Sequence, residues 1–112
     1  MKIYNSLVDL IEDIPSLPGR DWIYVNLDSW KSGPEKTKLF YIPWNYIQDL
    51  EGDEIYLDEE GMEMPKSVEK CNLRCWMLVS QLDYILKNKV DRGVRWFVEE
   101  INYYRENDEF RT

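Results

Sequence analysis

The sequence predicts an α+β fold: a small, mostly antiparallel sheet of three to four strands with helices packed against it, two of them adjacent at the C-terminus. Short runs rich in β-branched and aromatic residues, bounded by turn residues, indicate the strands. Two C-terminal segments with apolar residues at helical spacing indicate the adjacent helices. The chain has 112 residues, 44% of them hydrophobic, which suffices for one core. We therefore expect residues 1–112 to form a single domain.

The first expected elements are a helix and a strand. Apolar residues recur at helical spacing over 7–14, and either Asn5 or Ser6 can cap the start of this helix. Pro15 ends it, because proline cannot continue the hydrogen-bond ladder. The run WIYVNL at 22–27 is then typical of a strand.

The middle of the chain has weaker signals. Residues 29–36, SWKSGPEK, read as a loop because of their Gly-Pro and polar content. A second strand is expected over 37–42, and Pro43 should end it. The segment 44–52 fits either a short helical turn or a broad loop.

The next segment contains two more expected strands. EIYLD at 54–58 predicts a short strand, followed by a turn around Glu60 and Gly61. Residues 65–71 can form one helical turn with proline near its start. A fourth strand is expected over 73–79.

Capping signals are strongest at the C-terminus. Ser80 and Asp83 match a capping box at the start of a helix through 81–90. Asp91 is the expected cap of a last helix. One face of that helix carries Val94, Phe97, Val98, Ile101 and Tyr104.

The negative charge is concentrated in one segment. The net charge is −8, and residues 39–65 contain no Lys or Arg but eight of the 22 acids, so the remaining acids balance the 14 bases. These eight are Asp49, Glu51, Asp53, Glu54, Asp58, Glu59, Glu60 and Glu63. Such a surface repels nucleic-acid phosphates and anionic lipid and attracts a basic partner. We therefore expect no nucleic-acid and no membrane partner.

The sequence gives little support for an enzyme or a metal site. Histidine, the commonest general base and zinc ligand, is absent. Nucleotide-binding glycine motifs and GxSxG are absent too, and a hydrolase acting through carboxylates alone is the weakest alternative. Cys71 and Cys75 lack a second ligand pair and the CxxC spacing, and the acids do not match a calcium loop. We expect no catalytic residues, no cofactor and no metal.

The expected location is the cytoplasm. No run of about 18 apolar residues could cross a membrane. The N-terminus lacks the apolar run and cleavage site of a secretion signal. Two cysteines are then expected to be free thiols in a reducing compartment.

The candidate binding site is the acidic segment with its aromatic residues. Aromatic side chains anchor protein interfaces, and carboxylates steer and pair with a basic partner. The alternative is a half-buried strand with a hydrated outer face. We expect Trp22, Trp76 and Trp96 in the core and Trp30 in a loop, while Trp44 fits either the core or an interface. The candidate partner-binding residues are Trp44, Tyr46, Asp49, Glu51, Asp53, Glu54, Tyr56, Asp58, Glu59, Glu60 and Glu63.

The second half of the chain contains IYLDEEGMEMP, the QLDYILKNKV helix, and EEINYYRENDEF, with Tyr103, Tyr104, Asp108 and Phe110 in the closing pattern. Through these motifs, residues 54–110 resemble a family of small bacterial immunity proteins. These proteins are carried beside polymorphic toxins, including those of contact-dependent growth inhibition. The resemblance implies an inhibitor that binds a cognate toxin domain. We expect this toxin to be a nuclease that is neutralised by stoichiometric binding. Because nucleases must hold nucleic acid, the toxin domain is also expected to be basic. The alternative is a small acidic regulatory or adaptor domain that binds a basic host protein.

Overall fold

A four-stranded antiparallel sheet forms the centre of the molecule. The computed structural model describes residues 1–88 and 93–110. The strand order is β1-β3-β2-β6. The sheet comprises β1 (Lys2–Tyr4), β2 (Trp22–Val25), β3 (Leu39–Tyr41) and β6 (Arg74–Leu78). This confirms the α+β prediction, with β1 as a strand that the sequence did not indicate.

Alternation along the central strands sends side chains into two separate cores. Ile23 and Leu39 belong to a large cluster on one face, whereas Tyr24 and Phe40 belong to a smaller cluster on the other. Successive residues of a strand point to opposite faces, so the sheet separates the two clusters. Both faces must therefore be covered by other elements.

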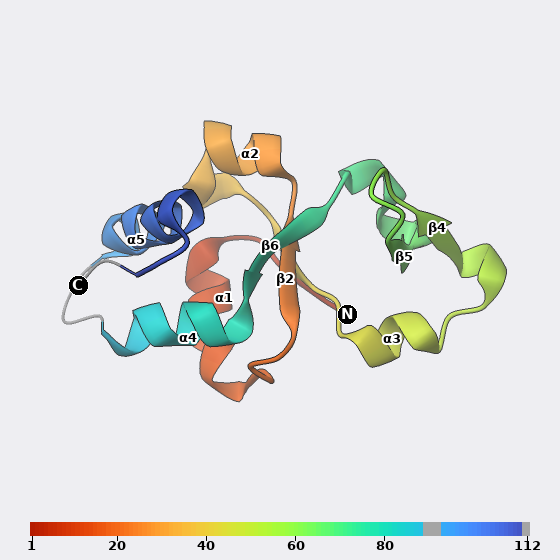
Figure 1. Cartoon of the computed structure of the whole chain (residues 1–112), viewed down its shortest axis with the longest axis horizontal. Helices are drawn as coiled ribbons and strands as arrows, with labels where there is room; N and C mark the ends of the chain where they lie inside the picture. Colours follow the sequence, from red (N-terminus) through yellow and green to blue (C-terminus); the bar gives the residue numbers. More distant parts are fainter. Residues whose placement is uncertain (89–92, 111–112) are drawn as a thin grey trace.

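Helices cover the face with the large cluster. They are α1 (Leu7–Asp13), α2 (Leu27–Ser32), α4 (Val79–Lys87) and α5 (Val94–Asn107). Figure 1 shows α1, α4 and α5 on the same side of β2 and β6. The two adjacent C-terminal helices were predicted correctly, and Phe97 and Ile101 are fully buried on the expected face of α5. The expected cap at Asp91 lies outside the described residues.

Ser6, one of the two caps expected from the sequence, caps α1. Its side chain accepts a hydrogen bond from the Asp9 backbone N–H at 3.4 Å. The expected box of Ser80 and Asp83 does not form, because β6 leads directly into α4 at Val79. Instead, Gln81 accepts a bond from the Leu78 backbone N–H at 2.9 Å.

The loop prediction for residues 29–36 is wrong, because α2 occupies much of this segment. Asn26 caps the helix by accepting a bond from the Ser29 backbone N–H at 3.0 Å. Trp30 is only 4% exposed and packs against Trp76, with ring centroids 4.7 Å apart. Trp76 was expected in the core, and it is buried there. Trp22 was also expected there, but it begins β2 at one end of the sheet and is 38% exposed.

A second layer covers the other face of the sheet. It contains α3 (Trp44–Gln48), a 3-10 turn η3 (Gly52–Glu54), and the antiparallel pair β4 (Ile55–Leu57) and β5 (Glu63–Pro65). Figure 1 shows these elements across β2 and β6 from α4 and α5. The strand expected at 54–58 exists, but β4 pairs only with β5 and not with the central sheet. We call residues 44–65 the acidic layer.

Candidate protein-binding surface

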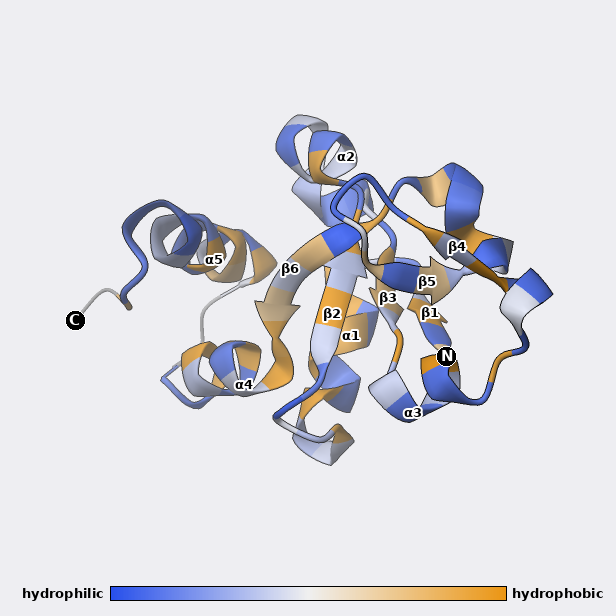
Figure 2. Cartoon of the chain, turned by 45° about the vertical axis from the view of Figure 1, so that its right-hand side comes forward, coloured by the Kyte–Doolittle hydropathy of each residue, from blue (hydrophilic) through white to orange (hydrophobic). Residues whose placement is uncertain are grey.

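The acidic layer is a folded part of the molecule with its own buried anchors. Ile47 of α3 and Met64 of β5 are each 1% exposed and pack with Phe40 and Tyr24 of the sheet. Another 3-10 helix, η4 (Lys66–Cys71), connects the layer to β6 and contributes the buried Val68. In Figure 2, α3 and the segment after it are mostly hydrophilic, with isolated hydrophobic positions. The charges are therefore held in place by packing.

The carboxylates point outward because alternate positions are used as anchors. In the hairpin, Tyr56 is paired with Met64 and faces the small cluster, while Leu57 is paired with Glu63 and faces away. Seven of the eight predicted acids are exposed and Asp58 is half buried. The seven are Asp49, Glu51, Asp53, Glu54, Glu59, Glu60 and Glu63.

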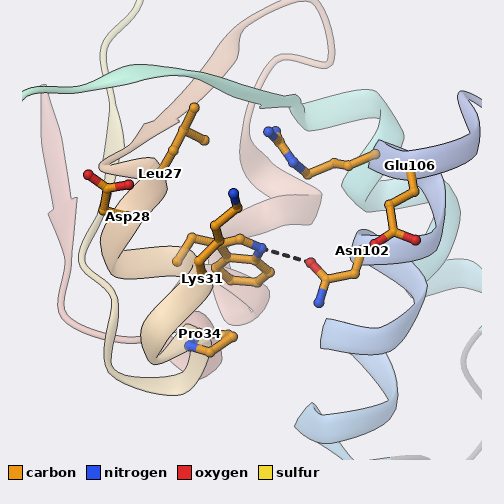
Figure 3. Close-up of a pocket in the computed structure, with 8 residues that line it drawn as sticks. Leu27, Asp28, Lys31, Pro34, Asn102 and Glu106 are labelled. Atoms are coloured by element: carbon orange, nitrogen blue, oxygen red, sulfur yellow. Dashed lines mark hydrogen bonds between the residues drawn. The ribbon is translucent and has the colours of Figure 1, made fainter.

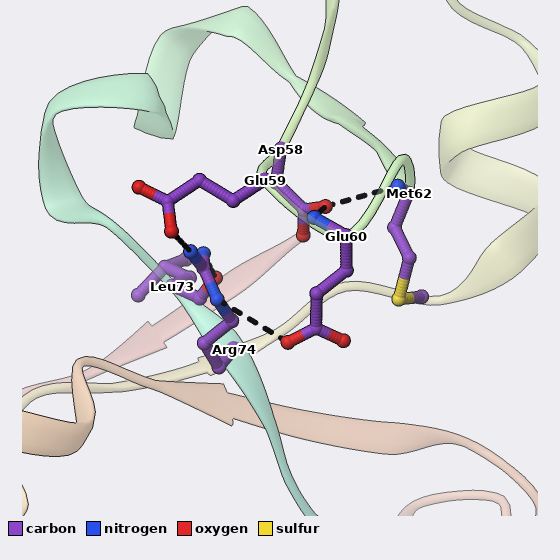
Figure 4. Close-up of polar contacts among 6 residues, drawn as sticks. All are labelled: Asp58, Glu59, Glu60, Met62, Leu73 and Arg74. Atoms are coloured by element: carbon purple, nitrogen blue, oxygen red, sulfur yellow. Dashed lines mark hydrogen bonds and ion pairs between the residues drawn. The ribbon is translucent and has the colours of Figure 1, made fainter.

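Asp58 shapes the turn between β4 and β5. One of its carboxylate oxygens, Oδ1, accepts hydrogen bonds from the backbone N–H groups of Glu60 and Met62, both at 2.9 Å (Figure 4). Gly61 adopts a φ of 79°, which glycine tolerates without strain. Asp58 therefore stabilises the turn that carries the exposed Glu59 and Glu60.

Arg74 fastens the tip of the hairpin to the central sheet. Its guanidinium lies 3.2 Å from a Glu59 oxygen and 3.5 Å from a Glu60 oxygen (Figure 4). The Arg74 side chain is 16% exposed and that of Glu59 is 88% exposed. One base thus offsets part of the charge of two acids. Within the described ranges 1–88 and 93–110, Asp49, Asp53 and Glu63 form no ion pair.

Exposed apolar side chains occur in the same layer as these acids. Leu57 is 65% exposed and Trp44 is 55% exposed, the two highest values for large hydrophobic residues in the described part of the chain. Met62, also in the layer, is 37% exposed. Sequence reasoning named Trp44 but missed Leu57 and Met62. The period-two alternation of IYL could have identified Leu57, since Tyr56 faces inward.

The two tyrosines among the predicted site residues lie beneath this surface. Tyr46 and Tyr56 are half buried and pack against the small cluster. The Tyr56 hydroxyl is buried and has no hydrogen-bond partner among the described residues. Burial raises the pKa of Tyr56. These rings support the layer from its inner side.

Two features bear on other kinds of site. Cys71 and Cys75 are half-buried free thiols, and burial raises the pKa of Cys75. Among residues 1–88 and 93–110, no group of three or more Cys, Asp or Glu side chains could hold a metal ion. In the same ranges, no helix is both long and apolar enough to cross a membrane.

A hollow of about 560 Å³ lies between α2 and α5, on the other side of the sheet (Figure 3). Trp30 lines it and donates a hydrogen bond from Nε1 to Oδ1 of Asn102 at 2.8 Å. Charges of both signs surround it, including Lys31 and Glu106. Arg105 donates a bond to the Trp76 carbonyl at 2.8 Å, and burial lowers its pKa. These polar contacts join α5 to the rest of the domain.

No protein-family model, curated protein or solved structure matches this chain.

Proposed function

We propose that this chain is an immunity protein that neutralises a cognate toxin domain, a basic nuclease, by tight stoichiometric binding in the cytoplasm. The acidic layer is the binding surface. The observation that carries the proposal is the exposure of Trp44 and Leu57 in a layer where seven of the eight acids are exposed as well. Apolar anchors surrounded by charged groups are typical of protein interfaces.

The charge of the layer suits a basic partner. A net charge of −8 that arises from one segment produces a directional field. Complementary fields raise association rates above the unsteered range of about 10⁵–10⁶ M⁻¹s⁻¹. Rapid capture is valuable for an inhibitor whose target destroys nucleic acid.

The packing of the layer supports tight binding as well. Ile47 and Met64 are buried, and Asp58 and Arg74 hold the hairpin tip in one conformation. A surface that is ordered before binding loses less conformational entropy when the partner arrives. The carboxylates can then replace the phosphates of the toxin's substrate at its basic site.

A titration of toxin activity tests the proposal. The toxin would be the C-terminal domain of a large secreted protein encoded beside this chain, and its nuclease activity would be followed on labelled RNA and DNA. We expect activity to fall linearly with added protein and to vanish at one equivalent. Full activity at a tenfold excess of this chain, with no complex in calorimetry, would refute the proposal.

Two variants with the same net charge separate the effect of the layer from the effect of total charge. Neutralising Asp49, Asp53 and Glu63 should weaken inhibition, whereas neutralising the exposed Glu12, Glu35 and Glu99 outside the layer should weaken it much less. Both variants change the net charge equally. Equal losses in the two variants would assign the effect to total charge and not to the layer.

A further inference from the structure

A second hollow, of about 400 Å³, lies beside the exposed Trp44. Its lining comes from the start of α3 and from the segment that leads into β2, and it includes Pro18, Asp21, Pro43 and Gln48. Trp44 and Gln48 are four residues apart and so share one face of α3, while Ile47 is buried beneath. The helix therefore turns an indole toward an open hollow.

The walls of this hollow combine apolar side chains with polar and charged ones. Pro18 and Pro43 have fixed backbone φ angles, and Tyr41, a residue that is 8% exposed, lies at the end of β3. Trp44 leaves 55% of its surface in contact with water. An exposed indole at the edge of a hollow offers a flat apolar face on which a planar group can stack.

One carboxylate in the hollow is held in a fixed position. Oδ2 of Asp21 accepts a hydrogen bond from the Tyr41 hydroxyl at 2.6 Å. The other oxygen, Oδ1, has no hydrogen-bond partner within the described residues. Asp21 can therefore accept a further bond from a donor that enters the hollow.

The chemistry of these groups selects an arginine side chain. A guanidinium is planar, stacks on aromatic faces and donates several hydrogen bonds at once. An indole is the most favourable aromatic partner for a cation, and a carboxylate accepts charge-assisted bonds from the guanidinium edge. The side-chain amide of Gln48 provides an additional acceptor at the rim.

We propose that this hollow binds an arginine side chain of a basic protein partner, stacked on Trp44 and hydrogen-bonded to Asp21. This inference rests on the proposed function for the nature of the partner, and it names a contact that the acidic layer alone does not specify. Asp49, the residue after Gln48, adds a negative charge at the C-terminal end of the same helix.

Arg20 provides an additional test of the inference. It lines the same hollow and is exposed, so its charge opposes the entry of a cation. Removing this charge should therefore strengthen the binding of an arginine side chain. Removing the same charge should not strengthen binding in a hollow that selected apolar or acidic groups.

The test uses a blocked hexapeptide that contains arginine and an otherwise identical peptide that contains citrulline, the uncharged isostere of arginine. Binding is followed by the NMR signals of the five tryptophan indole N–H groups, with the Trp44 signal assigned from Trp44→Phe. We expect the Trp44 signal to shift and saturate with the arginine peptide and to remain unchanged with the citrulline peptide. Equal shifts with both peptides would overturn the inference.

Variants identify the contributing groups. Trp44→Leu keeps an apolar side chain but removes the aromatic face, and it should weaken peptide binding about threefold to fivefold. Asp21→Asn should also weaken binding, and Arg20→Gln should strengthen it. Glu12→Gln, an exposed acid on α1, is the matched control and should change binding least. Unaltered amide spectra away from the hollow would show that each variant is folded, and undiminished binding by Trp44→Leu would refute the proposal.

Toxin inhibition separates this inference from the proposed function. If wild-type protein inhibits the toxin and Trp44→Leu inhibits it with unchanged affinity, the arginine site is wrong and the immunity function stands. If wild-type protein leaves the toxin fully active while the arginine peptide still shifts the Trp44 signal, the immunity function is wrong. The hollow would then recognise arginine in a different basic protein.

Discussion

The indole Nε1 of Trp30 donates a hydrogen bond to Oδ1 of Asn102 at 2.8 Å, joining residues that are 72 positions apart. Trp30 lies on α2 and Asn102 on α5, and the indole is 4% exposed. The bond satisfies a donor that burial removes from water. It also ties the C-terminal helix to a segment from the first third of the chain.

Asn102→Ala should lower the free energy of unfolding by about 1–3 kcal/mol, because it leaves a buried indole N–H without its partner. Urea unfolding followed by circular dichroism would measure the loss. Asn107→Ala is the control: Asn107 is exposed on the same helix, and among the described residues its side chain bonds only to the Tyr103 carbonyl, so a change within about 0.5 kcal/mol is expected. Similar losses in both variants would show that the bond to Trp30 contributes no more to the free energy of unfolding than an exposed side-chain bond does.

Asp58→Ala should destabilise the protein more than the removal of its acidic neighbours. The Asp58 carboxylate accepts two backbone N–H bonds in the turn, and each such bond contributes about 1 kcal/mol. Glu59→Ala and Glu60→Ala each remove one ion pair between an exposed glutamate and Arg74, and such a pair is worth about 1 kcal/mol or less. Thermal unfolding of the three variants would decide the order. An Asp58→Ala protein as stable as the wild type would show that the turn does not need this side chain.

Neutralising Asp49, Asp53 and Glu63 to their amides should slow association with the toxin about threefold to tenfold and leave dissociation less affected. The reason is loss of steering, so the difference from wild type should shrink as salt shortens the Debye length below about 8 Å. Stopped-flow association at several salt concentrations measures both effects. A rate difference that is independent of salt would mean that these acids act by direct contact only.

Stability should decrease at alkaline pH. Burial and the hydrogen bond to Asp21 raise the pKa of Tyr41 to about 12 from its ordinary value of 10.0. A group with a raised pKa in the folded state contributes stability that is complete below the unfolded pKa and lost as the pH rises through the folded value. The pKa values of Tyr4 and Tyr24 are raised too, chiefly by burial. The free energy of unfolding should therefore fall between pH 10 and 12.

Tyr41→Phe tests the contribution of this hydroxyl. The variant should lose less stability than the wild type over the alkaline range, because it has one fewer group to deprotonate. Tyr84→Phe changes a tyrosine that is 52% exposed and provides the comparison. Urea unfolding at intervals from neutral to alkaline pH gives the two slopes. Identical slopes for Tyr41→Phe and the wild type would contradict the assignment.

The sequence by itself determined the features that depend on neighbouring residues. The helix spacing of Phe97 and Ile101, the Ser6 cap, and the strand propensities of β2, β3 and β6 are short-range signals, and together they were enough for the α+β class. The concentration of acids in one segment also follows from the sequence alone. The immunity function remains a proposal.

Only the tertiary structure decided which side chains of that segment face the solvent and what each one contacts. Trp30 is buried because Trp76 and Asn102, distant in sequence, converge on it. Trp44, with the same side chain, is exposed because Ile47 is the residue of α3 that faces the sheet. Strand pairing likewise separates the buried Met64 from the exposed Leu57, and it brings Arg74 to the hairpin tip. Local pattern sets the helices and strands, but burial depends on contacts between segments that only the folded chain brings together.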